Sequence, residues 1–428
     1  MVGVTTLRYR LDSSWRRPNN GNSVIAGSPL RVFRLTDSGT RFIADVEADK
    51  QTITAAQQAL LDRLVDAGAL HPLPLAGPFT ATDVTIVVPA YNRLPTWTAR
   101  QTIIVDDGSI PPLASATLRH DVNRGPGAAR NTGLAEVKTP LVAFVDTDVS
   151  FTSDDWLTPL LPHFADHRVA LVAPRVASAP GATWLAAYEQ RHSPLDLGDE
   201  PARIKAGTRV SYVPAAAIVC RTDAIRSIGG FDEDLRTGED VDLVWRLVAA
   251  GHRCRYEPTS IVLHQPRGSL SALVRQRFGF GRSAARLAAR HPGALAPVRL
   301  NVWSAAFWVL VLLRRPKLAA VVLLGTVVAL TRKLRGVPPL ESARLAGLGT
   351  LAAGRQLADA ATRVWWPVAV VLAVLCRRSR LPIAAALIAL DSPAQLLDRM
   401  AYGAGVWAGV VSEGELAPLL PTLKRHSP

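Results

Sequence analysis

Hydrophobic and polar residues alternate in three different ways along the chain, which predicts three regions. Residues 1–76 combine short alternating runs with one segment, 53–70, whose apolar residues recur at helical spacing. Residues 83–292 alternate short β-branched runs with amphipathic segments, which is typical of an α/β sheet. Residues 293–428 carry long apolar runs separated by arginine clusters. We therefore predict a small N-terminal α+β domain of winged-helix-like type, a linker at 77–82, an α/β domain and a helical C-terminal region.

Local patterns predict individual elements of the first two regions. In the N-terminal domain, residues 7–15 and 28–46 have the composition of strands and turns, and residues 53–70 that of a helix. In the α/β domain, Pro126 begins a predicted helix. The predicted strands there are DVTIVVPAYN (83–92), TIIVDDGS (102–109), ATLRHDV (116–122) and LVAFVDTD (141–148).

The connection between the first two of these strands is unusually short. A parallel crossover usually needs a dozen or more residues and most often contains a helix. Only about eleven residues, from Tyr91 to Gln101, are available here, and Pro95 is among them. We expect either a single helical turn in this connection or a sheet face that another part of the chain covers.

Asp146 and Asp148 follow a buried strand directly and are separated by one residue. Residues i and i+2 of an extended chain point to the same side, so both carboxylates can face one ligand. Mg²⁺ and Mn²⁺ prefer oxygen ligands and often bridge to phosphate oxygens. A cap for the segment that follows is the structural alternative. His264 ends the predicted strand SIVLH, and its imidazole can complete a metal site if that strand ends beside Asp148.

Two further polar groups lie at the carboxyl ends of the predicted strands, where open parallel sheets bind ligands. Asp106 and Asp107 can accept hydrogen bonds from a base or ribose, although Asp-Asp-Gly-Ser is also ordinary turn chemistry. The segment 123–131 places glycines and arginines at a helix start, where Arg124 or Arg130 can reach a phosphate or a base. It lacks the ending of a Walker loop, and no GxGxxG follows a strand, which argues against a dinucleotide dehydrogenase.

The segment TGEDVDLVWRLVAAG, residues 237–251, predicts an amphipathic helix with three acids in its first turn. The helix dipole favours negative charge there, and this accounts for one acid. Three acids are more than capping requires. An ionised carboxylate among Glu239, Asp240 and Asp242 can act as a general base towards a hydroxyl group.

Composition adds a strong positive charge. The 428 residues include 49 Lys and Arg against 35 Asp and Glu, a formal net charge of +14. Such a balance favours phosphate-bearing partners, namely nucleic acid, anionic lipid or a nucleotide substrate. The arginines flank apolar segments instead of gathering with aromatic residues on one face, which disfavours nucleic-acid binding. The three cysteines, Cys220, Cys254 and Cys376, form neither a disulfide framework nor a zinc pattern.

The apolar runs of the last region favour a membrane surface. Each run is shorter than the roughly 20 residues of a spanning helix, so interfacial or re-entrant helices are as well supported as true spans. Basic flanks and the pair Trp365 and Trp366 suit a lipid interface, and a buried helical domain is the alternative. No signal peptide pattern opens the chain, so we expect the cytoplasmic face of a bacterial cell membrane. The runs cover 302–313, 318–330, 364–375 and 381–390.

Taken in order, the motifs PAYN, VDDGS, NRGPGAARN, DTD, GGFDEDL and GEDVDLVWRL resemble those of the family 2 inverting glycosyltransferases. The resemblance covers about residues 83–290 and implies the nucleotide-sugar-binding fold called GT-A. It implies Asp240, beside Glu239, as the base that deprotonates the acceptor hydroxyl, and Mn²⁺ or Mg²⁺ as a cofactor held by Asp146, Asp148 and His264. The residues it assigns to a UDP-sugar donor are Pro89, Tyr91, Asp106, Asp107, Arg124, Arg130 and Asp146.

A narrower resemblance is to the mycofactocin-system glycosyltransferases. It rests on the order of a small N-terminal domain, a transferase domain, GFGRSAARLAARHPGALAP (279–297) and a hydrophobic tail. It implies UDP-glucose as donor, a peptide-derived redox cofactor as acceptor, and a β-1,4-linked glucose chain as product. The N-terminal segment is similar to small peptide-binding domains of peptide-modifying enzymes.

The sequence departs from the family pattern in two places. The short connection after Tyr91 lacks a helix that the family normally carries, which puts the outer wall of the donor pocket in doubt. The Gln-x-x-Arg-Trp motif of processive members is not matched, since Gln276 is followed by Arg277, Phe278 and Gly279. Arg277 and Phe278 remain candidates for an acceptor channel. A lipid-linked acceptor, such as a polyprenyl phosphate or cell-wall glycan, and a degenerate transferase acting as a scaffold stay open.

Overall fold

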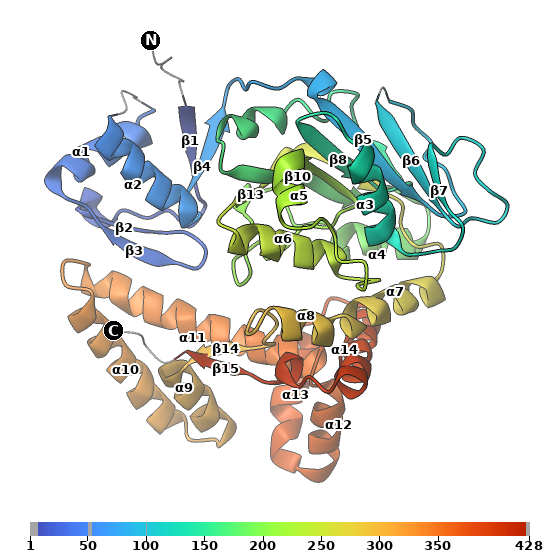
Figure 1. The fold of residues 1–428 in the computed structure, drawn as a ribbon. Helices are drawn as coiled ribbons and strands as arrows, with labels where there is room; N and C mark the ends of the chain where they lie inside the picture. The colour runs from blue at the N-terminus through green and yellow to red at the C-terminus, as the bar shows by residue number, and fades with distance from the viewer. Residues whose placement is uncertain (1–6, 50–53, 100, 425–428) are drawn as a thin grey trace. The chain divides into compact units, whose positions relative to one another are not determined.

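The computed structural model of the chain describes residues 7–49, 54–99 and 101–424 (Figure 1). The chain divides into two compact units, Met1–Pro266 and Arg267–Pro428. The first unit contains the predicted N-terminal domain and the predicted α/β domain as far as Pro266. The second unit begins earlier than the boundary that we predicted after residue 292.

The N-terminal domain contains two helices and two antiparallel strand pairs, which share one hydrophobic core. Val24, Ile43 and Leu61 are completely or almost completely buried in that core. The winged-helix-like type stays a prediction. The elements are β1 (Leu7–Leu11) paired with β4 (Leu70–Pro74), β2 (Ser23–Ala26) paired with β3 (Arg31–Arg34), a 3₁₀ turn (Pro18–Asn20), α1 (Asp37–Glu47) and α2 (Ala55–Asp66).

Helix α1 corrects the expectation of strand and turn for residues 28–46, which holds only for β3 and its flanks. Thr36 caps this helix by accepting a hydrogen bond from the Gly39 N–H at 3.1 Å. Phe42, Ile43 and Val46 are buried along one side of it. The helix is short and begins with Asp-Ser-Gly, three poor helix formers, and this obscured its helical spacing in the sequence.

The described residues of the α/β domain form a nine-stranded mixed sheet, which confirms the predicted α/β class. In order across the sheet, its strands are β11 (Ala202–Arg203), β13 (Arg253–His264), β10 (Val169–Ser178), β12 (Ala217–Arg221), β8 (Leu141–Val145), β5 (Val84–Ala90), β6 (Thr102–Asp107) and β7 (Leu118–His120), with β9 (Val149–Phe151) paired to β13. β8, β5, β6 and β7 run parallel, and β12 runs antiparallel to both β8 and β10. The carboxyl ends of these four parallel strands therefore meet at one edge of the sheet.

Helices between these strands carry the remaining motifs. α3 lies close to the sheet because Gly133 faces the side chains of Val87 and Val105, where a Cβ atom would collide with Val87. The four helices are α3 (Pro126–Glu136), α4 (Trp184–His192), α5 (Thr222–Ser227) and α6 (Glu239–Ala249), and 3₁₀ turns cover Ala81–Asp83 and Leu161–Ala165.

The short connection between β5 and β6 forms no helix over its described residues, 91–99. Trp97 covers part of the sheet face that a helix in this connection would otherwise cover. Its indole N–H donates to the Val149 carbonyl oxygen at 2.9 Å, and its ring lies 5.0 Å from that of Phe151. The side chain packs against the sheet core. A single large aromatic ring can therefore cover sheet area that a helix would otherwise cover.

The second unit is mainly helical, as predicted for the C-terminal region. Among its described residues, no single helix is long and apolar enough to cross a membrane, although two sharply bent helix pairs pass that test jointly. Its elements are α7 (Leu270–Arg282), α8 (Ala284–Arg290), β14 (Arg299–Asn301), α9 (Val302–Leu312), α10 (Pro316–Lys333), α11 (Pro339–Thr362), α12 (Trp366–Leu375), a 3₁₀ turn (Arg377–Ser379), α13 (Arg380–Ile388), α14 (Pro393–Glu413), a 3₁₀ turn (Ala417–Leu419) and β15 (Thr422–Lys424).

Close packing of α7 on α14 explains why the unit boundary precedes α7. Glycines let the two backbones touch: a Cβ on Gly281 would collide with the Tyr402 carbonyl oxygen, and one on Gly405 with the Phe278 carbonyl oxygen. Arg277 adds an ion pair to Asp398 at 3.0 Å. α7 is therefore part of the core of the helical unit.

We expect Gly405→Ala to destabilise the second unit by about 1–3 kcal/mol, because the added methyl group meets backbone that cannot give way. Gly347→Ala is the matched control, since Gly347 lies in helix α11 with open space around it. The control should be neutral or stabilise by up to about 1 kcal/mol through helix propensity. Thermal unfolding of the two full-length variants measures both effects, and equal melting temperatures would contradict the packing described.

Candidate functional site

The carboxylates at the end of β6 are bound to the protein's own backbone. Asp106 accepts hydrogen bonds from the Ser109 and Leu113 N–H groups at 2.9 and 3.0 Å and pairs with Arg119. Burial alone would raise the pKa of Asp106, but these hydrogen bonds and the Arg119 charge lower it to about 2. Asp106 therefore shapes the loop after β6, and a direct contact with a base or ribose stays a prediction.

Asp107 holds the glycine-rich turn at the start of α3. Its carboxylate accepts hydrogen bonds from the N–H groups of Arg124 and Gly125, both at 2.8 Å, and contacts the His120 ring at 2.8 Å. Gly125 has φ +99°, a conformation that favours glycine. The turn chemistry that we weighed against ligand binding is thus present for both aspartates.

Arg130 occupies the centre of the site. It extends from α3 and pairs with Asp146, at the end of β8, and with Glu239, at the start of α6, each at 2.7 Å. Its side chain is only 3% exposed. Burial disfavours the charged guanidinium, but the two carboxylates outweigh that effect and raise the pKa of Arg130. The structure places Arg130 between two acids, and the predicted contact of Arg130 with a phosphate or base stays a prediction.

The acids at the start of α6 differ in their surroundings. Burial, together with the neighbouring Asp240, raises the pKa of Glu239 to about 7, although Arg130 opposes the shift. Asp242 is fully buried and pairs with Arg246 one turn later, so its role is structural. Asp240 is half-buried and accepts hydrogen bonds from the N–H groups of Val241 and Ala215 at 2.8 and 3.2 Å.

Burial also raises the pKa of Asp240, against the effect of these two hydrogen bonds and of Arg130. The segment that supplies Ala215 also binds Asp146, since the Asp146 N–H donates to the Ala216 carbonyl oxygen at 2.9 Å. β12, α6 and the end of β8 therefore bring Asp240 and Asp146 into one site.

Asp148 and His264 lie side by side. This is the arrangement that we required for the His264 imidazole to complete a metal site. β9 runs antiparallel to β13, and Val149 is paired with His264 in this register. The His264 Nε2 atom lies 3.2 Å from an Asp148 carboxylate oxygen. Asp146 and Asp148 therefore have different partners, Arg130 and His264, although the charges of Asp148 and His264 also act on the pKa of Asp146.

Asn131 and Phe231 are two functional positions to which the sequence motifs gave no role. The Asn131 side chain accepts from the Phe231 N–H at 2.8 Å and donates to the Phe231 carbonyl oxygen at 2.9 Å. The Phe231 ring lies 5.2 Å from the Arg130 guanidinium carbon. Asn131 therefore fixes the loop that covers Arg130. The only signal was the presence of both residues in the quoted motifs NRGPGAARN and GGFDEDL.

The remaining candidates lie around and outside this group. Tyr91, just after Pro89 in β5, is 53% exposed and can present its ring to a ligand. Arg124 is half-exposed and pairs with Glu233 at 2.7 Å. Arg277 is buried in the second unit and paired with Asp398, and Phe278 touches Gly405 through its backbone. A part in acceptor binding for Arg277 and Phe278 stays a prediction.

The arrangement combines two chemical capacities. A half-buried carboxylate whose pKa is raised, Asp240, suits a general base. An aspartate and a histidine in contact, Asp148 and His264, are ligands that a divalent cation accepts. Among the described residues no cluster of three or more His, Cys, Asp or Glu side chains has metal-binding geometry. A cation here would therefore need further ligands from a substrate, as Mg²⁺ often takes from phosphates.

Comparison with known proteins gives a matching family model and several relatives. The family model for glycosyl transferase family 2 matches residues 85–228. The pre-mycofactocin glycosyltransferase of Mycobacterium tuberculosis is 38% identical over 461 aligned positions, which cover 97% of each chain. The succinoglycan biosynthesis protein ExoO of Rhizobium meliloti is 28% identical and covers 45% of this chain and 64% of its own.

A solved structure of a mannosyltransferase from Pyrobaculum calidifontis, in complex with GDP-Man and Mn²⁺, covers 77% of this chain and 86% of its own. It is 16% identical, with a TM-score of 0.42, and at that level the likeness supports no inference about this chain.

We expect Arg130→Met to destabilise the first unit by about 3–5 kcal/mol at neutral pH, because Asp146 and Glu239 would remain buried without a cation. Without the arginine, both carboxylates are harder to ionise, so the deficit should shrink as the pH falls and they take up protons. Denaturant unfolding at several pH values measures this. In the control Arg124→Met, which breaks a half-exposed ion pair, the cost should be below about 1 kcal/mol. A deficit in Arg130→Met that is independent of pH would contradict the bridging role.

Proposed function

This chain belongs to glycosyl transferase family 2, and on that premise we propose that it transfers glucose from UDP-glucose to the peptide-derived precursor of the redox cofactor mycofactocin, building a β-1,4-linked chain. The observation that carries the proposal is the match to the pre-mycofactocin glycosyltransferase, which extends over 97% of both chains and so includes both compact units. The sugar, the linkage and the acceptor are parts of the proposal.

Asp240 is the proposed base. Its half-buried carboxylate takes the proton of the acceptor hydroxyl, and the acceptor oxygen forms a bond to the anomeric carbon of the donor. The bond from that carbon to the diphosphate oxygen breaks, and UDP leaves with the electron pair. Attack from the face opposite the leaving group inverts the anomeric configuration. The Val241 and Ala215 N–H groups hold the carboxylate in one orientation for this step.

Asp148 and His264 are the proposed protein ligands of Mn²⁺ or Mg²⁺. The fit rests on their separation of 3.2 Å, since neighbouring ligands of an octahedral ion with bonds of about 2.1 Å lie about 3 Å apart. A cation bound there would neutralise charge that develops on the departing diphosphate. We assign Asp146 a weaker part in this site, because its carboxylate is paired with Arg130.

The donor pocket is proposed to lie at the ends of β5 and β6. Tyr91 offers an exposed ring on which a base can stack, beside the backbone of Pro89. Asp106 and Asp107 act here through the loops that they hold, and Arg124 is the exposed cation of the glycine-rich turn. Arg130 acts as a positioning residue for Asp146 and Glu239.

A lipid-linked acceptor is the second candidate, and the second unit supplies the observation that favours it. Most of the exposed large hydrophobic side chains of the described chain belong to residues 267–424, with Val374 at 68% exposure and Leu375 at 79%. Arg377, Arg378 and Arg380 follow them directly. Exposed apolar helices beside cations fit an anionic lipid surface. We therefore propose that this unit attaches the enzyme to the cytoplasmic face of the membrane, whichever acceptor is used.

Asp240→Asn should lower kcat by about 10²–10⁴-fold while leaving UDP-glucose binding intact, because the amide cannot take a proton. Asp148→Ala should lose metal-dependent UDP binding as well. Release of UDP from a panel of UDP-sugars, with Mn²⁺ or with a chelator, measures both. Asp154→Asn, an exposed aspartate in the same domain, is the control and should behave as wild type.

The pH profile of the same reaction gives a further check. Because the base must be ionised and burial raises the pKa of Asp240, kcat/KM should rise with pH through a pKa above that of an ordinary aspartate.

Full activity of Asp240→Asn would refute the proposed base. If peptide-derived acceptors give no product and polyprenyl phosphates do, the second candidate replaces the first.

Val374→Glu should weaken binding to phosphatidylglycerol vesicles at least several-fold, because a carboxylate replaces an apolar side chain at the proposed lipid contact. Val122→Glu, at the same 68% exposure in the first unit, is the matched control and should bind as wild type. Vesicle flotation of the full chain gives the bound fraction. Equal binding by both variants would exclude this part of α12 from the lipid contact.

A further inference from the structure

A cavity of about 180 Å³ lies where the N-terminal domain meets the α/β domain, within the first unit. Its volume is several times the roughly 30 Å³ that one water molecule occupies in the liquid. Its walls come from the end of α2, the strand β11, the end of α6 and the start of β13. Lys205 and Gly251 are exposed at its rim, so the cavity reaches the surface.

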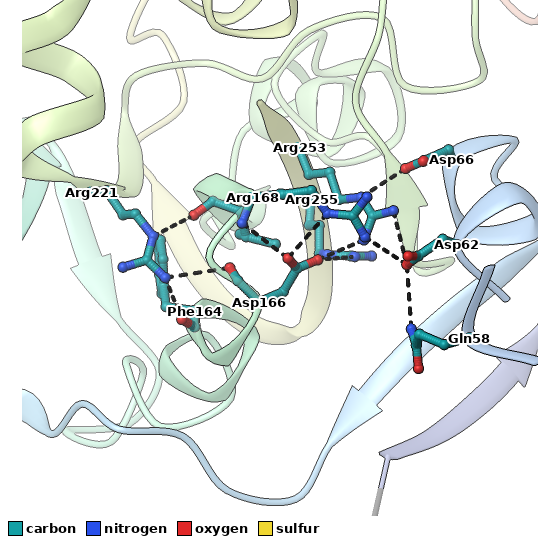
Figure 2. A network of polar contacts seen from close by, with 10 residues as sticks. Gln58, Asp62, Asp66, Phe164, Asp166, Arg168, Arg221, Arg253 and Arg255 are labelled. Carbon is teal, nitrogen blue, oxygen red and sulfur yellow. Dashed lines mark hydrogen bonds and ion pairs between the residues drawn. The ribbon is translucent and has the colours of Figure 1, made fainter. Parts of the chain in front are cut away.

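The cavity is lined by five arginine and lysine side chains, with three carboxylates in and beside it. Figure 2 shows how three of the cations use these carboxylates. Arg253 binds Asp66 and Asp166 at 2.7 Å each, and Arg168 binds Asp62 at 2.6 Å. The cations are Arg168, Arg203, Lys205, Arg253 and Arg255, and the carboxylates are Asp62, Asp66 and Asp166.

Arg203 and Lys205 are the two cations of the cavity that take no part in this network of ion pairs. Within the part of the chain that the structure describes, no carboxylate lies within ion-pair distance of either side chain, whereas Arg255 approaches Asp166 at 3.6 Å. The stem of Arg203 packs against Gly68, which fixes its direction. Burial lowers the pKa of Arg203; the charge of Asp66 opposes this shift, and the charges of Arg31 and Arg253 add to it. An excess of two positive charges therefore remains around the cavity.

This cavity is separate from the catalytic group. It lies at the amino end of β13, at Arg253–Arg255, whereas His264 ends the same strand. The paired strand β10 spans the same stretch from Val169, opposite Arg253, to Ser178, opposite His264, and its nine residue steps correspond to roughly 30 Å. A donor diphosphate bound near Asp148 and His264 cannot reach the cavity.

We propose that this cavity is a binding site for a small phosphate dianion, either inorganic phosphate or a phosphate monoester, held by Arg203 and Lys205. The two uncompensated charges match a dianion, and guanidinium and ammonium groups are the side chains that bind phosphate oxygens best. His252 lines the same cavity and offers a ring nitrogen as a further donor. Since α2 contributes Val65 and Asp66 to the wall, an occupied site adds to the contacts between the two domains.

The test is binding of inorganic phosphate to the full chain at low ionic strength, measured by calorimetry and by the rise in melting temperature. The double variant Arg203→Gln, Lys205→Gln should bind at least tenfold more weakly than wild type, with a correspondingly smaller rise. The charge-matched control is Arg41→Gln, Lys138→Gln, which removes two exposed cations elsewhere in the unit. A second arm with glycerol 3-phosphate separates a monoester from free phosphate as the preferred ligand.

Comparing phosphate binding by the double variant and by the control variant distinguishes a specific phosphate site from the general attraction of a basic protein for anions. If the double variant and the control bind phosphate equally, or if neither differs from wild type, the proposal is wrong. Lys205→Gln alone replaces an exposed side chain, so it tests the site should the double variant fail to fold; it should weaken binding several-fold. UDP release is not part of this readout, so an inactive transferase would leave the outcome unaffected.

Discussion

The pairing of one buried guanidinium with two carboxylates is the constraint on which the rest of the site depends. Arg130 joins α3, the end of β8 and the start of α6, three segments that the sheet brings to the same edge. A buried cation is tolerated only with its counter-charges in place, so each segment must arrive in one position. The pair Asp146 and Glu239 thereby fixes where Asp240 lies.

Other contacts serve the same arrangement from outside. Asp107 holds the turn that starts α3, and Asn131 clamps the Phe231 loop over the guanidinium. Several motif residues that suggested ligand contacts therefore contact other groups of the protein in this structure. The groups that we propose to meet substrates are fewer: the Asp240 carboxylate, the pair of Asp148 and His264, and the exposed ring of Tyr91. Such a division, with rigid support behind a few reactive groups, is what preorganised catalysis requires.

The two units are stabilised by different interactions. In the first, charge is buried and satisfied by partners far apart in the sequence, both at Arg130 and at the Arg253 network between the domains. In the second, glycines such as Gly281 and Gly405 bring backbones into contact, while long apolar side chains such as Val374 remain exposed. Helices that pack through small residues leave their large residues free for another apolar surface, which agrees with the proposed lipid contact.

The sequence by itself determined the elements whose signals are local. Apolar runs defined β5, β6 and β8, the acid-rich start defined α6, and the carboxylates at Asp146, Asp148 and Asp240 were visible as motifs. The sequence failed to predict α1, where the local signal was weak. The capping residue Thr36 and the short run of apolar residues after it were not enough to indicate a helix. The sequence also left open how the sheet is covered after Tyr91, which Trp97 answers by packing against Phe151.

Only the tertiary structure decided which partner each charged group has. Arg130 and Glu239 are 109 positions apart, and no periodicity relates them. The same holds for His264, which reaches Asp148 through the register of β9 on β13. Hydrophobic spacing reflects contacts between residues a few positions apart, so it can be read from the sequence. Charge pairing depends on which strand ends meet, and the order of the strands in the folded sheet determines which ends meet.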